Sequence, residues 1–257
     1  MQDLVIAYLQ YDIQWHDWEA NTSIIQRHLD SLNRDIDLLI LPETFSSGFT
    51  MQPNPVAQRM NGPVVQWMSK TASDRDHVVI GSVIIEEDGA FFNRLICAHR
   101  DGTTNHYDKR HLFTYAGESD QFTSGNHRLQ FKIRDWTICP LICYDLRFPV
   151  WSRNTHDYDV LVYVANWPAP RIGAWQALLK ARAIENQAYV LGVNRTGKDN
   201  NDYQYPGSSE VFDMTGTSLY KSNSEDEMAV VVLNKSDLDN YRSQYNFLAD
   251  RDSYIVD

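Results

Sequence analysis

The residue best suited to chemistry is Cys143, which lies in the stretch CPLICYDLRFPVWSR at residues 139–153. An apolar run stops at this cysteine, and charge begins directly behind it with Asp145 and Arg147. A cysteine at the end of a buried strand is either an inert packing group or, as its thiolate, a nucleophile. Cys139, which has apolar neighbours, fits the packing role better. A metal site shared by the two cysteines is disfavoured, because their offset along a strand holds the sulfurs too far apart.

Two more reactive side chains lie at the ends of predicted strands. Glu43 ends the run IDLLILPETF, and Lys109 follows a hairpin turn at Asp101-Gly102, within HYDKRHLF. Taken singly, such a glutamate is most often a solvated turn residue and such a lysine a surface charge. Ligands of open α/β sheets lie beyond the carboxyl ends of the strands, so residues at several strand ends can converge on one site. We therefore expect Glu43, Lys109 and Cys143 to meet.

These three side chains have complementary chemistry. A carboxylate beside a thiol raises the thiol pKa, yet it can accept the proton when the sulfur attacks. A lysine ammonium offsets the repulsion and can hold the oxyanion of a tetrahedral intermediate. The backbone N–H of Tyr144 is a second oxyanion donor if the strand turns sharply into a helix. These three side chains therefore allow proton transfer without a histidine. We assign no role in the reaction to His106 and His111, which flank Lys109.

The elements that must position these residues alternate along the chain. Strands are predicted at 4–10, 36–45, 77–87, 92–102, 136–143, 160–166, 188–194 and 227–234, with a hairpin at 208–221. Helices are predicted at 21–33, with Asn21 or Thr22 near its cap, at 64–75, at 174–187 and at the start of the tail from 235. No linker or repeat interrupts this order. We expect one layered α/β domain over residues 1–257, a mixed sheet system covered by helices.

Composition narrows the class of protein. The chain has 257 residues, of which 43% are hydrophobic and 22% charged, and a formal net charge of −11. The negative charge disfavours a nucleic acid or an anionic membrane as partner. The sequence has no basic, apolar leader and no run of about 20 apolar residues that could span a bilayer. An odd count of three cysteines indicates reduced thiols. We expect a cytoplasmic protein.

Three stretches, LPETFSSGFT, YDKRHLF and CYDLRFPVWSR, together resemble the nitrilase superfamily of carbon–nitrogen hydrolases. The stretches NWPAPR, AWQALLKARAIENQAYV and PGSSEVFDMTG continue the likeness in the same order, so that it covers nearly the whole chain. Within the superfamily the sequence looks most like the bacterial ω-amidase branch. That branch acts on monoamides of 2-oxo dicarboxylic acids.

The resemblance implies roles for four residues. Cys143 would be the nucleophile, Glu43 the general base and Lys109 the stabiliser of the oxyanion. Glu118, in YAGESDQF, stands where the family often has a second glutamate and would orient Lys109 or the attacking water. The implied reaction hydrolyses the terminal amide of 2-oxoglutaramate or 2-oxosuccinamate through a thioester, with no metal or organic cofactor.

The resemblance also implies a fold and an assembly. The family fold is a four-layer αββα sandwich, and its members commonly form homodimers. The C-terminal tail, residues 236–257, would then reach a partner subunit.

A carboxylate-bearing substrate calls for an arginine, which binds a carboxylate through two parallel hydrogen bonds. Arg195, at another strand end, is the preferred candidate over Arg147 and Arg171. Arg147 follows the nucleophile so closely that we expect it to form an ion pair with Asp145 or Glu185 instead.

Aromatic side chains are the expected walls of the pocket. They are Trp167, Phe113 and Phe49, although aromatic residues often only pack.

Other functions compete with this hypothesis. A different amidase of the same superfamily would act on deaminated glutathione or an N-carbamoyl compound. A cysteine–histidine peptidase is weaker, because no histidine motif follows a suitable strand and the Glu43–Lys109 pair would go unexplained. A non-catalytic binding module would not need Glu43, Lys109 and Cys143, and all three are present.

Overall fold

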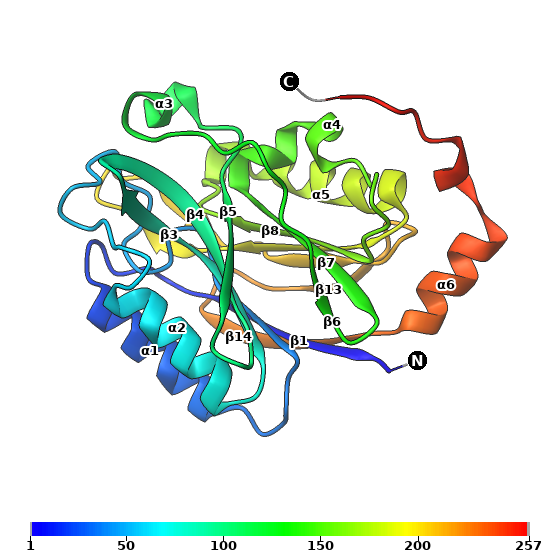
Figure 1. Ribbon diagram of the computed structural model, residues 1–257, viewed down its shortest axis with the longest axis horizontal. Helices are drawn as coiled ribbons and strands as arrows, with labels where there is room; N and C mark the ends of the chain where they lie inside the picture. The colour runs from blue at the N-terminus through cyan, green and yellow to red at the C-terminus, as the bar shows by residue number, and fades with distance from the viewer. Residues whose placement is uncertain (1, 256–257) are drawn as a thin grey trace.

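Two six-stranded mixed sheets stack face to face, with helices on their outer faces (Figure 1). This computed structural model describes residues 2–255. The layers follow the order α-β-β-α, which confirms the expected four-layer sandwich. Each sheet contains parallel strands at its centre and antiparallel strands at its edges.

The first sheet carries two helices on its outer face. Its strands, in spatial order, are β14 (Glu227–Leu233), β1 (Leu4–Gln10), β2 (Leu38–Ile40), β3 (Val78–Glu87), β4 (Ala90–Ala98) and β5 (Thr104–Asp108). The covering helices are α1 (Trp18–Asp30) and α2 (Pro63–Asp74). Ile25 and Leu29 of α1, with Val64 and Met68 of α2, bury their side chains against this sheet in one apolar cluster. The spacing of these residues is that of an amphipathic helix face.

The second sheet is covered by α5 (Ile172–Asn186) (Figure 1). Its strands are β13 (Ser218–Lys221), β12 (Glu210–Phe212), β9 (Tyr189–Asn194), β8 (Val160–Ala165), β7 (Trp136–Ile142) and β6 (Phe131–Ile133). Helix α5 packs tightly on β9 at Gly192, where a Cβ atom would lie only 2.3 Å from Leu179 Cδ1. The central strands β8 and β9 are buried along their whole length and mostly apolar, because both of their faces are covered.

Several further elements are short. They are the two-stranded hairpin β10 (Thr196–Lys198) and β11 (Gln204–Pro206), the short helices α3 (Glu118–Gln121) and α4 (Pro149–Ser152), and the 3-10 helices η1 (Thr114–Ala116), η2 (Cys143–Arg147), η3 (Ala169–Arg171) and η4 (Phe247–Asp250). No helix within residues 2–255 is long and apolar enough to cross a membrane.

The tail packs on its own subunit. It consists of α6 (Lys235–Gln244), η4 and an extended end. Arg242 donates to Asp159 Oδ1 (3.0 Å), and Arg251 donates to Asp157 Oδ1 (2.6 Å). Near the end, Tyr254 donates its hydroxyl to the backbone oxygen of Val150 (2.6 Å). These bonds fold the tail back along the second sheet as far as α4.

Most predicted elements are present, and the differences have local causes. Helix α1 begins at Trp18, because Asp17 caps it by accepting from Ala20 N (2.9 Å), so the expected cap at Asn21 or Thr22 is wrong. Strand β2 pairs over only three residues and then gives way to the turn that holds Glu43. Strands of three residues, such as β6, β10 and β11, are too short to show an alternating pattern.

Cys139 is fully buried in β7. Burial raises its pKa to about 12, so the thiol stays neutral and inert.

Candidate active site

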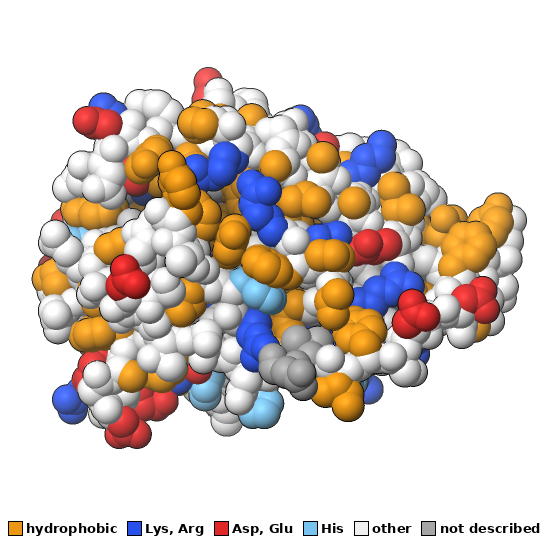
Figure 2. Space-filling model, turned by 90° about the horizontal axis from the view of Figure 1, so that it is seen from above, with side chains coloured by type: hydrophobic (Ala, Val, Ile, Leu, Met, Phe, Trp, Pro, Cys, Tyr) orange, Lys and Arg blue, Asp and Glu red, His pale blue; other side chains and the backbone are white. Residues whose placement is uncertain are grey.

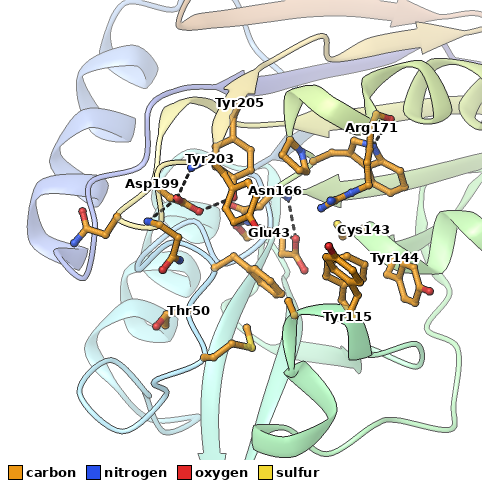
Figure 3. A pocket seen from close by; sticks show the side chains of 18 of the residues that line it. Glu43, Thr50, Tyr115, Cys143, Tyr144, Asn166, Arg171, Asp199, Tyr203 and Tyr205 are labelled. Carbon is orange, nitrogen blue, oxygen red and sulfur yellow. Dashed lines mark hydrogen bonds between the residues drawn. The ribbon is translucent and has the colours of Figure 1, made fainter.

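Three strand ends meet at one cavity. Glu43 lies three residues beyond β2, Lys109 follows β5 directly, and Cys143 follows β7 directly. All three line a cavity of about 610 Å³. Figure 3 shows Glu43 and Cys143 pointing into the same space, with Arg171 reaching toward it from η3. The convergence expected from the sequence is therefore present.

The backbone turns sharply at Cys143. Strand β7 ends at Ile142, and Cys143, the first residue of the 3-10 helix η2, adopts the left-handed conformation with φ of +43°. This conformation is unfavourable for a residue with a side chain, and it persists only where the surroundings enforce it. The turn places the thiol at the end of the strand and supplies the sharp strand-to-helix change that an oxyanion donor at the Tyr144 N–H requires.

Lys109 is the centre of a buried ionic cluster. Its Nζ lies 2.8 Å from Glu43 Oε1 and 2.9 Å from Glu118 Oε2, and the three side chains are at most 1% exposed. Asn93, in β4, donates from Nδ2 to Glu43 Oε1 (2.8 Å) and to Glu118 Oε1 (3.2 Å). The backbone N–H of Phe113 donates to Glu118 Oε2 (2.5 Å). Two carboxylates thus share one ammonium and one amide.

The cluster controls the charges of its members. Burial by itself would lower the pKa of Lys109, but Glu118 and Glu43 outweigh burial and raise it, so the ammonium persists. Burial raises the pKa of Glu118, and Lys109 opposes the rise. Burial and the nearby Glu43 carboxylate raise the pKa of Cys143 well above its ordinary value, with Lys109 opposing. The resting thiol is therefore protonated, and attack by the sulfur requires a base beside it.

A side chain from the second sheet holds the other oxygen of Glu43. Asn166, directly after β8, donates its backbone N–H to Glu43 Oε2 (2.9 Å) and its Nδ2 to the backbone oxygen of Glu43 (2.7 Å). Sequence reasoning missed Asn166, although its place just beyond a strand end is the same signal that identified Cys143. It also missed Asn93, whose only signal is an amide beside Arg94 within a mostly apolar strand.

The expected aromatic walls are present, since Phe49, Phe113, Tyr144 and Trp167 all line the cavity. Further lining residues that the sequence did not identify are Trp15, Tyr115, Asp199, Tyr203 and Tyr205. The last three come from the β10–β11 hairpin and the loop at its tip. Asp199 accepts from the Tyr205 hydroxyl (2.8 Å), which ties this hairpin together at the cavity (Figure 3).

The choice of Arg195 as the substrate arginine needs correction. Arg195 is fully buried and does not line the cavity. Its Nη2 donates to Asp12 Oδ1 (2.7 Å), and its guanidinium lies 4.7 Å from the ring centre of Tyr205. It follows β9 as expected, but its side chain turns toward the end of β1. The charge of Arg195 is therefore paired within the protein and is not offered to a substrate.

Arg147 and Arg171 line the cavity instead. Arg147 lies over Trp167 and Arg171 over Phe113, each with the guanidinium carbon 5.0 Å from the ring centre. Such stacking holds a guanidinium in place while leaving its N–H groups free for an anion.

The expected ion pair of Arg147 with Asp145 or Glu185 is wrong. Asp145 instead accepts hydrogen bonds from Tyr107 and His111, and Glu185 forms an ion pair with Arg182 at 2.9 Å.

Within residues 2–255, no three histidine, cysteine or acidic side chains form a cluster that could hold a metal ion.

Comparison with known proteins places this site in a family. The carbon–nitrogen hydrolase model matches residues 5–243. The chain is 41% identical to the ω-amidase YafV of Escherichia coli K12 over 255 residues, 99% of each chain. It is 32% identical to the 2-oxoglutaramate amidase of Bacillus subtilis, covering 86% of this chain and 87% of that one.

A solved structure agrees over the full length. A carbon–nitrogen hydrolase superfamily protein of Xanthomonas campestris, with an arsenic adduct in its active site, superposes with a TM-score of 0.97 at 37% identity and covers 100% of both chains. The present chain belongs to the carbon–nitrogen hydrolase family and is a hydrolase acting on carbon–nitrogen bonds.

Loss of the cation from the ionic cluster should strongly lower the stability of the fold. Lys109→Met leaves two buried carboxylates facing each other without a cation, and we expect it to lower the free energy of unfolding by about 3–5 kcal/mol. Adding Glu118→Gln should recover part of this loss. The control is Lys70→Met, which removes an exposed pair with Asp74 and should cost less than about 1 kcal/mol. Urea unfolding measures all three, and equal losses at Lys109 and Lys70 would contradict the role given to burial.

Proposed function

We propose that this chain is an ω-amidase, with residues 1–257 as one catalytic domain. Its substrates are monoamides of 2-oxo dicarboxylic acids, such as 2-oxoglutaramate and 2-oxosuccinamate, and its products are the 2-oxo acid and ammonia. The observation that carries the proposal is one cavity in which a thiol, a carboxylate and an ammonium face two arginines. The relatives named ω-amidase and 2-oxoglutaramate amidase support it.

In the proposed mechanism Cys143 Sγ attacks the amide carbon while Glu43 takes the thiol proton. The ammonium of Lys109 and the Tyr144 N–H stabilise the oxyanion. When the tetrahedral intermediate collapses, the carbon–nitrogen bond breaks, and Glu43 returns the proton to the departing ammonia. A thioester on Cys143 remains.

Hydrolysis of the thioester uses the same groups. Glu43 takes a proton from water, the hydroxide attacks the thioester carbon, and the proton returns to the leaving sulfur. Glu118 keeps the ammonium of Lys109 in place through both halves of the reaction, since it contacts Nζ with both carboxylate oxygens (3.0 and 2.9 Å).

Arg147 and Arg171 replace Arg195 as the groups that bind the substrate carboxylate. Both lie in the cavity wall with their flat faces on aromatic rings. The face that carries α3 and α4 supports an anionic substrate, since Figure 2 shows basic side chains gathered across its middle among hydrophobic ones. This local charge attracts a small acid to a protein whose overall charge is negative. Phe49, Phe113, Trp167 and the Tyr144 N–H complete the binding site.

The cavity volume favours one alternative. At about 610 Å³ the cavity is larger than a five-carbon acid requires. A longer amide, such as deaminated glutathione or an N-carbamoyl compound, would use the same nucleophile and a different part of the walls.

We also propose a cytoplasmic homodimer. Exposed Phe247, Tyr254 and Ile255 on the tail, together with Val150 on α4, support an interface at which the tail meets a partner subunit. Sedimentation velocity measures the mass directly, and a monomer at micromolar concentration would contradict this assembly.

The test of the activity is ammonia release from 2-oxoglutaramate, with glutamine, deaminated glutathione and an N-carbamoyl amine assayed in parallel. We expect selective turnover of 2-oxoglutaramate, and no turnover by Cys143→Ala. Buried Cys139→Ala is the control and should retain activity, because Cys139 lies outside the cavity lining. Turnover of another amide through Cys143 would overturn the substrate, and activity in Cys143→Ala would overturn the mechanism.

Removal of either cavity arginine should selectively weaken the binding of substrates that carry a carboxylate. Arg171→Met should raise KM for 2-oxoglutaramate by about tenfold or more, because a hydrogen bond to a charged group contributes about 1.5–3 kcal/mol. Arg147→Met should behave alike. A matched amide without the carboxylate should show little change. Arg59→Met, at an exposed pair with Glu86, is the control. Equal losses for the charged and uncharged amides would argue against a carboxylate contact.

A further inference from the structure

The reacting groups come from two different sheets. Glu43 and Lys109 follow strands of the first sheet, whereas Cys143 follows a strand of the second. Across residues 2–255 the two six-stranded sheets share no strand ladder. The place of the Lys109 ammonium relative to the thiol therefore depends on side chains that bridge the sheets.

Asp145 is such a bridge. It lies two residues after Cys143, and its side chain is fully buried. Its Oδ2 accepts from the backbone N–H of Ile142 (3.0 Å), directly before the nucleophile, and from the hydroxyl of Tyr107 (2.7 Å). Its Oδ1 accepts from the backbone N–H of His111 (3.1 Å) and from the ring Nδ1 of His111 (2.8 Å). One carboxylate thus satisfies four donors.

The donors from the first sheet flank Lys109. Tyr107 lies two residues before it and His111 two residues after it. Burial and the Asp145 charge raise the pKa of Tyr107 well above its ordinary value, so its hydroxyl keeps the proton that it donates. The ring of His111 also stacks on Phe148 of the nucleophile turn, with ring centres 3.6 Å apart and planes within 4°. The residues on both sides of Lys109 thus contact the turn that carries Cys143.

We propose that Asp145 and His111 are positioning residues, which hold the Lys109 ammonium and the Cys143 thiol in register across the two sheets. Neither side chain lines the cavity, so substrate does not touch them. The sequence gave His111 no role in the reaction, and this proposal goes beyond that expectation. The inference rests on the proposed amidase function, because the two groups act through its lysine and its nucleophile.

Substitutions at His111 separate its two contacts. His111→Phe keeps the stacking on Phe148 and loses the donor at Nδ1, whereas His111→Asn places an amide N–H near the position of Nδ1. We expect kcat for 2-oxoglutaramate to fall by about tenfold or more in His111→Phe, since small misplacements of reacting groups are costly. KM should stay within about twofold, because Arg147 and Arg171 are unchanged. His111→Asn should recover most of kcat, and His106→Phe, at an exposed position of β5, should change neither constant.

A second measurement does not need the substrate. The Lys109 ammonium favours the thiolate of Cys143, so displacement of the lysine should slow alkylation of the thiol by iodoacetamide at fixed pH. We expect slower alkylation in His111→Phe and recovery in His111→Asn. Cys97 and Cys139 are fully buried and do not compete. If wild type ignores 2-oxoglutaramate but alkylation follows this order, the proposed function fails and the positioning role stands.

A folded His111→Phe variant, as judged by its thermal unfolding midpoint, overturns the proposal if alkylation is unchanged. It does so also if His111→Asn recovers nothing, or if KM rises together with the fall in kcat. If His111→Phe does not fold, kcat, KM and the alkylation rate of Asp145→Asn test the proposal instead. This substitution turns an NH2 group toward groups that are all donors, so we expect kcat and the alkylation rate to fall further than in the His111 variant.

Discussion

The buried ammonium of Lys109 is shared by the carboxylates of Glu43 and Glu118, and the chemistry of the site depends on this sharing. Three ionised groups out of contact with water would be unfavourable unless each had partners. Asn93 and the backbone N–H groups of Phe113 and Asn166 supply the remaining hydrogen bonds. Because burial and the Glu43 carboxylate raise the pKa of the neighbouring Cys143, its thiol stays protonated at rest. A base that is already fixed beside the thiol is therefore a requirement of the site.

The second constraint is the junction between the sheets. Strand pairing fixes the positions of residues within a sheet, but it fixes nothing between sheets. Polar side chains make this connection at the cavity. Asn166 ties the end of β8 to Glu43, and Asp145 ties the nucleophile turn to both flanks of Lys109. The left-handed backbone at Cys143 is held by the same bonds, since Asp145 also accepts from Ile142 N.

The acidic protein has a basic cavity wall because aromatic rings, rather than carboxylates, hold the arginines there. Arg147 and Arg171 rest on Trp167 and Phe113, so their positions are set by aromatic faces and their N–H groups stay available to a ligand. Arg195 shows the opposite case. Its guanidinium donates to Asp12 and lies against the ring of Tyr205, so it does not face the cavity. The same residue type thus stays open to a ligand in one place and stabilises the structure in the other.

The sequence alone determined the strands and the reactive residues at their ends. An apolar run that ends abruptly in a reactive residue identified Glu43 and Cys143, because the end of a buried strand is visible as a change from apolar to charged residues. The return strand of a hairpin identified Lys109. Glu118 came only from family resemblance, since nothing local separates it from a surface glutamate. The tertiary structure decided the directions of side chains and the contacts between sheets. Arg195 follows a strand as Cys143 does, yet its side chain turns toward Asp12. The side-chain amide of Asn166, which follows a strand of the second sheet, acquires its partner at Glu43 only when the two sheets meet. Local pattern records where a residue lies along a strand, whereas long-range packing determines what its side chain touches.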